Sequence, residues 1–172
     1  SAPNEDWQLN WDVHVMSHVY AARAVLPSMI ARGDGYLVQM ASAAGLLNQI
    51  ADAAYSATKH AAVSFAESLF ITHRGDGVKV SVICPQYVAT PIIGLKAEDA
   101  DGQGSLLSPD QAATAIMQGI ADERFLILTH PVVKDYVQLR AADHERFLGG
   151  MRALRAKAVD EHGQIRPESF HK

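Results

Sequence analysis

Helical and strand-like patterns alternate along the whole chain, and this alternation constrains the fold more than any other feature. Helix-like periods cover residues 5–31, 52–73, 108–120 and 132–159, and short apolar runs typical of strands cover residues 36–41, 78–84 and 124–129. Such alternation is typical of a parallel sheet whose strands are joined by crossover helices. We therefore predict an α/β fold containing part of a doubly wound parallel sheet of about three strands.

The first and last helices carry residues that disturb a regular helix. Trp7 and Trp11 begin a helical apolar stripe, which predicts that this face packs against the core. Pro27 near the end of the first helix predicts a kink or a local break. Gly149 and Gly150 are expected to weaken the last helix.

Composition and charge exclude several classes of protein. The 172 residues are 48% hydrophobic and 20% charged, enough apolar material for one ordinary globular domain. The formal net charge of -4 offers no attraction to nucleic acid or to an anionic membrane, and no apolar run is long enough to span a bilayer. Cys84 is the single cysteine, which excludes an intrachain disulfide and fits a cytoplasmic location.

A tyrosine and a lysine stand four residues apart in the small-residue segment "AYSATKHAA". Residues at this spacing share one face of a helix, so the ammonium of Lys59 can lower the pKa of the Tyr55 phenol and make it a proton donor and acceptor. Ser42 lies thirteen residues before Tyr55, just beyond the expected strand 36–41. Polar groups at the carboxyl ends of parallel strands are typical of a catalytic site.

A third segment belongs to the same edge of the predicted sheet. "CPQYVATP" follows the strand at 78–84, and Pro91 biases Thr90 toward an extended backbone that presents its hydroxyl and amide groups to a ligand. We expect the three segments to converge at one site.

Together these motifs resemble the classical short-chain dehydrogenases and reductases. The resemblance rests on Ser42, on "YSATK" at 55–59 with its thirteen-residue interval, and on "P-x-x-V-x-T" at 85–90, and it covers at least half of the chain. It implies a Rossmann-like fold, of which this sequence would hold about three of the usual seven strands.

The resemblance also implies roles for these residues. Tyr55 would be the general acid and base, and Lys59 would lower its pKa and bind the nicotinamide ribose. Ser42 would orient the substrate oxygen. Pro85, Val88 and Thr90 would belong to the segment that contacts the nicotinamide of NAD or NADP. The implied reaction interconverts a secondary alcohol and a carbonyl.

The sequence departs from the family pattern at three places. His14 stands where the family has an asparagine of the catalytic set, so a proton relay to Lys59 would use an imidazole. Gln86 replaces the usual glycine after Pro85. The glycine-rich turn that seats the dinucleotide phosphates does not occur in the 172 residues, so we expect either the C-terminal portion of a longer enzyme or a truncated product. The alternative is a non-catalytic oligomerisation module that lacks cofactor binding.

The resemblance completes the expected organisation of the chain. We expect a single domain or part-domain with a catalytic segment at 8–91, a substrate lid at 92–108 that pivots at Gly94 and Gly102, a helix–strand–helix segment at 109–160 and a polar tail at 161–172. A homodimer or homotetramer would form through helices 8–31 and 53–73.

Weaker signals concern the ligands. The substrate would be a small carbonyl or alcohol, and Leu46, Leu47, Ile92, Ile93 and Leu95 hint that it is apolar. His14 and His18 lie four apart, but no third ligand is evident, so we predict no metal site.

Overall fold

A three-stranded parallel sheet forms the centre of the protein. The computed structural model describes residues 2–101 and 104–159. The strands β1 (Gly35–Met40), β2 (Val78–Ile83) and β5 (Leu126–Ile127) pair in the order β1-β2-β5, and all run in the same direction. The predicted partial doubly wound sheet is therefore confirmed, although β5 is shorter than the strand expected at 124–129.

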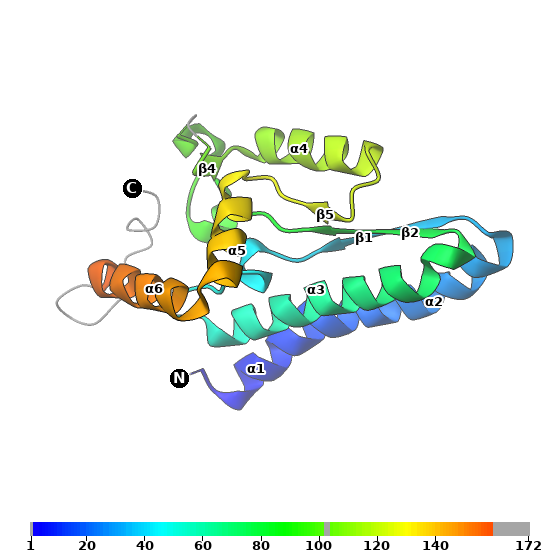
Figure 1. Cartoon of the computed structure of the whole chain (residues 1–172), viewed down its shortest axis with the longest axis horizontal. Helices are drawn as coiled ribbons and strands as arrows, with labels where there is room; N and C mark the ends of the chain where they lie inside the picture. The colour runs from blue at the N-terminus through cyan, green and yellow to red at the C-terminus, as the bar shows by residue number, and fades with distance from the viewer. Residues whose placement is uncertain (1, 102–103, 160–172) are drawn as a thin grey trace.

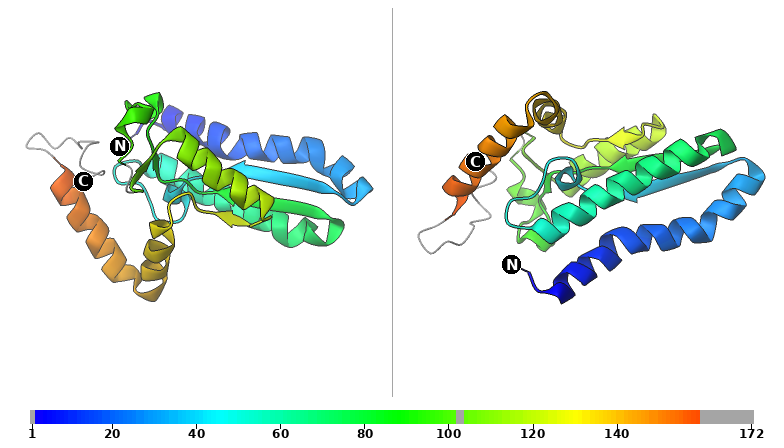
Figure 2. Two further views of the ribbon diagram at one scale, coloured as in Figure 1. Left: turned by 90° about the horizontal axis from the view of Figure 1, so that it is seen from above. Right: turned by 60° about the horizontal axis from the view of Figure 1, so that its bottom comes forward.

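Helices cover both faces of this sheet. The long helix α3 (Ala53–His73) connects β1 to β2, and α4 (Pro109–Ala121) leads from the region after β2 to β5. Figure 1 shows α4 above the sheet and α3 below it, and Figure 2 shows α2 (Ser17–Arg32) on the same side of the sheet as α3. The carboxyl ends of the strands therefore lie at the end of the sheet where α3 begins.

The first predicted helix contains an irregular turn at an unexpected place. The structure divides it into α1 (Asn4–Trp11), a π-helical turn at Asp12–Met16, and α2. No break occurs at Pro27, because α2 continues through it to Arg32 and ends at Gly33, whose φ of 66° suits glycine. The wider turn surrounds His14, and such turns recur at functional sites.

The C-terminal helical region breaks at a different residue from the one expected. It forms α5 (Val132–Ala142) and α6 (His144–Ala158), and Asp143 accepts a hydrogen bond from the backbone N–H of Arg146 at 2.9 Å. Such a side-chain cap starts a new helix. Gly149 and Gly150 lie inside α6 without ending it, and the tail at 161–172 lies outside the described residues.

Between β2 and α4 the chain forms a second, small sheet that the sequence pattern does not indicate. β3 (Tyr87–Val88) pairs in parallel with β4 (Leu106–Leu107). This pairing ties the segment after β2 to the end of the region expected to be a lid. The helix that follows begins at a serine cap, because Gln111 N–H donates to Ser108 Oγ at 3.2 Å.

Small residues allow α3 to approach the sheet closely. The core between them consists of Ala22, Ala41, Ala62, Val63, Ala66, Leu69, Val80, Val82 and Cys84. Gly45 continues this contact beyond β1, since a Cβ atom there would lie 2.5 Å from the Lys59 carbonyl oxygen. The expected core-facing stripe is wrong at its start, because Trp7 and Trp11 are 40% and 43% exposed. In the described part of the chain, no helix is long and apolar enough to cross a membrane.

Candidate active site

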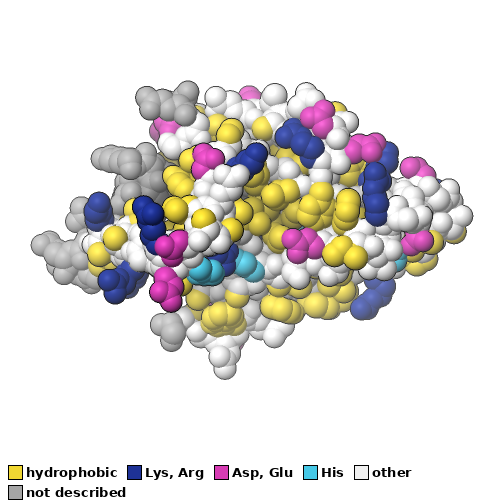
Figure 3. All heavy atoms as spheres, viewed as in Figure 1, with side chains coloured by type: hydrophobic (Ala, Val, Ile, Leu, Met, Phe, Trp, Pro, Cys, Tyr) yellow, Lys and Arg dark blue, Asp and Glu magenta, His cyan; other side chains and the backbone are white. Residues whose placement is uncertain are grey.

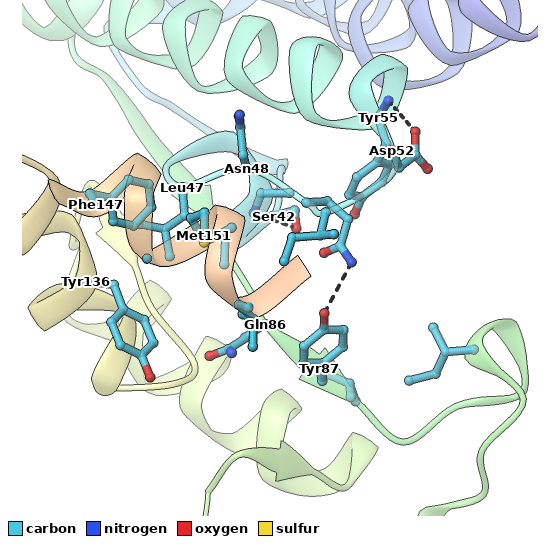
Figure 4. A pocket seen from close by; sticks show the side chains of 18 of the residues that line it. Ser42, Leu47, Asn48, Asp52, Tyr55, Gln86, Tyr87, Tyr136, Phe147 and Met151 are labelled. Carbon is cyan, nitrogen blue, oxygen red and sulfur yellow. Dashed lines mark hydrogen bonds between the residues drawn. The ribbon is translucent and has the colours of Figure 1, made fainter. Parts of the chain in front are cut away.

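A large cavity opens at the carboxyl ends of β1 and β2 (Figure 4). Its volume is about 1130 Å³. It is lined by Ser42, Ala43, Ala44, Leu47, Asn48, Gln49, Ile50, Asp52, Tyr55, Gln86, Tyr87, Val88, Thr90, Ile92, Ile93, Tyr136, Leu139, Arg146, Phe147, Gly150, Met151 and Leu154. Four of the residues singled out from the sequence thus share one cavity: Ser42, Tyr55, Val88 and Thr90.

Two local motifs fix Ser42 and Tyr55 at the cavity wall. Ser42 follows β1 with an extended backbone, and its hydroxyl accepts a hydrogen bond from Ala44 N–H at 3.1 Å. Tyr55 lies in the first turn of α3, where Asp52 caps the helix by accepting a hydrogen bond from Tyr55 N–H at 2.9 Å. The Ser42 hydroxyl lies close enough to the Tyr55 phenol to lower the pKa of that phenol. The segments that follow β1 and open α3 therefore meet through these two hydroxyl groups.

Lys59 lies behind Tyr55, away from the cavity lining. Its side chain is buried, its ammonium lies 5.4 Å from the centre of the Tyr55 ring, and it donates a hydrogen bond to the Met40 carbonyl at 3.3 Å. The predicted juxtaposition of phenol and ammonium is therefore present. The four-residue spacing on α3 and the hydrogen bond of Lys59 to the end of β1 together produce this arrangement.

The pKa of Tyr55 differs from the expectation. Burial raises the pKa of the Tyr55 phenol above its ordinary value, and the neighbouring Ser42 hydroxyl opposes this only in part. The lowering expected from Lys59 is therefore not the dominant effect in this structure. Burial likewise lowers the pKa of Lys59, because the charged ammonium loses hydration. Burial raises the pKa of the nearby Cys84 thiol to about 12, which leaves it protonated and inert.

His14 supports Tyr55 from the side of α1 and α2. Its ring meets the Tyr55 ring edge-on with 5.2 Å between the centres, and its Nδ1 lies 3.1 Å from the hydroxyl of Thr58. The Thr58 hydroxyl donates its single proton to a carbonyl of the preceding helical turn, so it accepts a hydrogen bond from the Nδ1–H group of His14. Burial and the charge of Lys59 lower the pKa of His14, which favours the neutral ring.

Hydrogen bonds fix the segment that follows β2 to the loop between β1 and α3. The Pro85 carbonyl accepts a hydrogen bond from Ala43 N–H at 2.8 Å, and the Ser42 hydroxyl lies 3.5 Å from the same oxygen. Pro85 thus contacts the site through its backbone and does not line the cavity. The Tyr87 hydroxyl accepts a hydrogen bond from the Gln49 amide at 3.2 Å (Figure 4).

Several parts of the cavity could not be found from the sequence pattern. Tyr136, Leu139, Phe147, Met151 and Leu154 reach it from α5 and α6, which follow the last strand. Of the five apolar residues expected near a ligand, Leu47, Ile92 and Ile93 line it. Gly94 has a φ of 74°, which a pivot would tolerate, whereas Gly102 lies outside the described residues.

The loop between β1 and α3 carries a further feature without a sequence signal. Asn48 and Ala51 have φ values of 113° and 67°, which side-chain-bearing residues rarely adopt. Such conformations persist where surrounding contacts hold them, and they are often found at binding sites.

Comparison with known proteins agrees with this geometry. The sequence model of the short chain dehydrogenase family matches residues 1–101. The chain is 36% identical over 132 residues to 1-deoxy-11-beta-hydroxypentalenate dehydrogenase of Streptomyces avermitilis, covering 76% of this chain and 49% of that protein. The chain thus spans about half the length of the curated relatives it matches.

Solved structures of short chain dehydrogenases also superpose on this fold. A short chain dehydrogenase/reductase from Burkholderia phymatum, solved with NAD, superposes with a TM-score of 0.71 at 30% identity, covering 84% of this chain and 60% of that one. One from Burkholderia cenocepacia, solved with NADP, has a TM-score of 0.71 at 17% identity and covers 93% and 62% of the two chains; it supports the fold alone.

Fold and site together define an α/β protein of the Rossmann type with a serine, a tyrosine and a lysine clustered at the carboxyl ends of its strands. The chain belongs to the short chain dehydrogenase family.

Proposed function

We propose that this chain carries the catalytic and substrate-binding part of an NAD- or NADP-dependent oxidoreductase that interconverts a secondary alcohol and a carbonyl. The observation that carries the proposal is the placement of the Ser42 and Tyr55 side chains in one cavity, with the Lys59 ammonium 5.4 Å from the centre of the tyrosine ring. A proton donor and acceptor, an orienting hydroxyl and a fixed positive charge are the groups that such a reaction requires.

The residues divide the proton chemistry between them. When bound, the nicotinamide supplies a hydride acceptor or donor for the substrate carbon. In alcohol oxidation, Tyr55 takes the hydroxyl proton, while Ser42 holds the substrate oxygen within reach of the phenol. The charge of Lys59 favours the phenolate that this step needs. In reduction, Tyr55 returns the proton to the carbonyl oxygen.

His14 fits a supporting role in this scheme. Its neutral ring packs against Tyr55 and points Nδ1 at Thr58, so its other nitrogen is left as a hydrogen-bond acceptor. We propose that this nitrogen holds a water molecule on a path to Lys59, in the place of the family's asparagine.

The walls of the cavity favour an apolar substrate. Leu47, Ile92, Phe147 and Met151 lie around the polar centre. Apolar walls with a few placed polar groups are typical of small-molecule sites. One relative is named as the dehydrogenase of a hydroxypentalenate, a compound with a hydroxyl group. The region 92–108 would act as a lid over it.

The chain's own residues fit the nicotinamide end of a dinucleotide. Val88 and Thr90 line the cavity beside Tyr55, where the family pattern expects the carboxamide contact. Since the phosphate-binding turn is not in these 172 residues, nothing in them selects between NAD and NADP.

Nucleotide binding is the first prediction to test. The intact mass of the purified protein is measured first. We then expect NADH or NADPH to bind to the protein and to quench the fluorescence of its tryptophans. The reaction is then followed by nicotinamide absorbance with a series of secondary alcohols of increasing apolar size. If neither nucleotide bound at millimolar concentration and no alcohol were oxidised, the non-catalytic module would be the better description.

The exposed apolar face of α1 and α2 supports a second prediction, that the chain forms a homodimer or homotetramer through helices 8–31 and 53–73. Leu9 and Trp11 on α1 and Val13 in the turn that follows it are exposed, and Figure 3 displays apolar side chains along the lower margin where α1 and α2 run. Large exposed apolar patches mark interaction surfaces. We expect sedimentation equilibrium to give a multiple of the single-chain mass, and Trp11→Asp to give the single-chain mass.

A matched control tests whether any added charge would have this effect. Met117→Asp on α4, where the side chain is 63% exposed on the opposite side of the sheet, is expected to keep the assembled mass. A wild-type protein that sediments as one chain at micromolar concentration would contradict the interface.

A cytoplasmic location stays a prediction from composition.

A further inference from the structure

His130 is completely buried directly after β5, next to the segment that enters the active site. It lies in none of the motifs that indicate the family, and it does not line the cavity. Three hydrogen bonds nevertheless connect its ring to neighbouring groups. A histidine side chain that is shielded from solvent and has both ring nitrogens in hydrogen bonds is held in one orientation.

The bonds of His130 determine where its proton lies. Gln86 N–H points at His130 Nδ1 at 3.2 Å, so this nitrogen carries a lone pair. The Thr129 hydroxyl lies 2.7 Å from the same nitrogen and donates to it as well. On the other side, Nε2 lies 3.0 Å from the Tyr87 carbonyl and must donate a proton to it. Both sides therefore require the neutral ring with its proton on Nε2.

These contacts hold the two peptide groups that flank Gln86 and Tyr87. The same stretch continues into Val88 and Thr90, which line the cavity beside Tyr55. It is also tied on its other side, because Ala89 N–H donates to the Leu107 carbonyl at 2.8 Å. The ring thus couples the end of β5 to the backbone that borders the reacting groups.

We propose that His130 is a positioning residue of the active site, which as the neutral Nε2–H tautomer holds the backbone from Gln86 to Thr90 in its working geometry. This role rests on the proposed function, since its effect on catalysis passes through the nicotinamide-contacting segment. A protonated ring would point an N–H group at Gln86 N–H and break that contact. Small displacements of groups that orient reactants cost up to about 100-fold in rate.

The surroundings of His130 are consistent with a ring that stays neutral. Burial lowers the pKa of His130, and this outweighs the Tyr87 carbonyl and the Asp101 carboxylate, which both favour the protonated form. Since a lowered pKa keeps the ring neutral to below its ordinary titration range, the contact is expected to persist at neutral pH and to fail only in acid.

The first test reads the ring and its contacts without any cofactor. Nitrogen NMR of the imidazole is expected to show Nδ1 unprotonated and Nε2 protonated at neutral pH, and hydrogen exchange is expected to show a protected Gln86 amide. His130→Leu should expose that amide to exchange, while the surface variant His144→Gln should not. A ring protonated on Nδ1, or unchanged Gln86 protection in His130→Leu, would overturn the proposal.

The second test separates positioning from simple stability. His130→Gln places an amide near Nε2 that can still donate to the Tyr87 carbonyl, and His130→Asn places an oxygen near Nδ1 that can still accept from Gln86 N–H. In the reduction direction, we expect both variants to raise KM for the nicotinamide cofactor and lower kcat by roughly 10- to 100-fold, at temperatures where both remain folded. Neither variant contains an imidazole that can be protonated. The loss of activity in acid that we assign to protonation of His130 should therefore disappear from their pH–rate profiles.

The outcomes of the two tests are distinguishable. If both variants kept the KM and kcat of the wild-type protein and lost activity in acid at the same pH, the positioning role would be refuted. Loss of Gln86 protection in His130→Leu, with no nucleotide bound by the wild-type protein, would refute the proposed function while supporting the holding contact.

Discussion

Tyr55→Phe is expected to lower kcat for both alcohol oxidation and carbonyl reduction by on the order of 10²–10⁴-fold, the contribution of a positioned acid or base. The substitution removes the hydroxyl that meets Ser42 and keeps the ring that packs edge-on against His14 at 5.2 Å. Folding should therefore be retained. The measurement is steady-state kinetics in both directions, with a thermal melt to confirm the folded state.

The pKa of Tyr55 sets the expected pH dependence of the wild-type protein. Because burial raises this pKa, the phenolate needed for oxidation becomes more abundant as pH rises, so oxidation should speed up from neutral to alkaline pH. Reduction starts from the protonated phenol and should be flat near neutrality. Tyr20→Phe, whose ring is 57% exposed on α2, serves as the control. If Tyr55→Phe kept kcat within a few-fold of wild type, another group would have to carry the proton.

The placement of Ser42, Tyr55 and Lys59 could be predicted because it depends on short-range rules. A helix brings residues four apart to one face, and the loops at the carboxyl ends of neighbouring parallel strands meet at one edge. The structure follows both rules, since Ser42 follows the end of β1 and Tyr55 lies in the first turn of α3. Family motifs supplied the roles, which geometry alone does not assign.

Other features depend on contacts between distant segments, and no pattern of local spacing predicts them. The direction of the Tyr55 pKa follows from how much of the ring is buried, which requires the folded molecule. Two of the hydrogen bonds of His130 join it to residues 44 and 43 positions away in the chain. The packing of α6 against the cavity likewise follows from the cap at Asp143, not from Gly149 and Gly150.

Lys59→Met should produce the second large effect, and it tests what the buried ammonium does. Lys59 lies against Tyr55 and the Met40 carbonyl, and burial already lowers its pKa, so its charge is held at a cost to stability. Methionine has a similar shape without the charge. Removing the ammonium relieves the cost of keeping a charge away from water, so the melting temperature should not fall substantially.

Catalysis should respond differently from stability. Without the ammonium, the phenolate of Tyr55 loses its nearby positive charge, so the pKa of Tyr55 rises further and oxidation shifts to higher pH. We expect kcat for oxidation at neutral pH to fall by roughly 10- to 100-fold, and part of this loss to be recovered at alkaline pH. Lys59→Arg keeps a positive charge and should move the pH profile less than methionine does. If Lys59→Met lowered the rate equally at every pH, the ammonium would act by binding the cofactor ribose and not by tuning Tyr55.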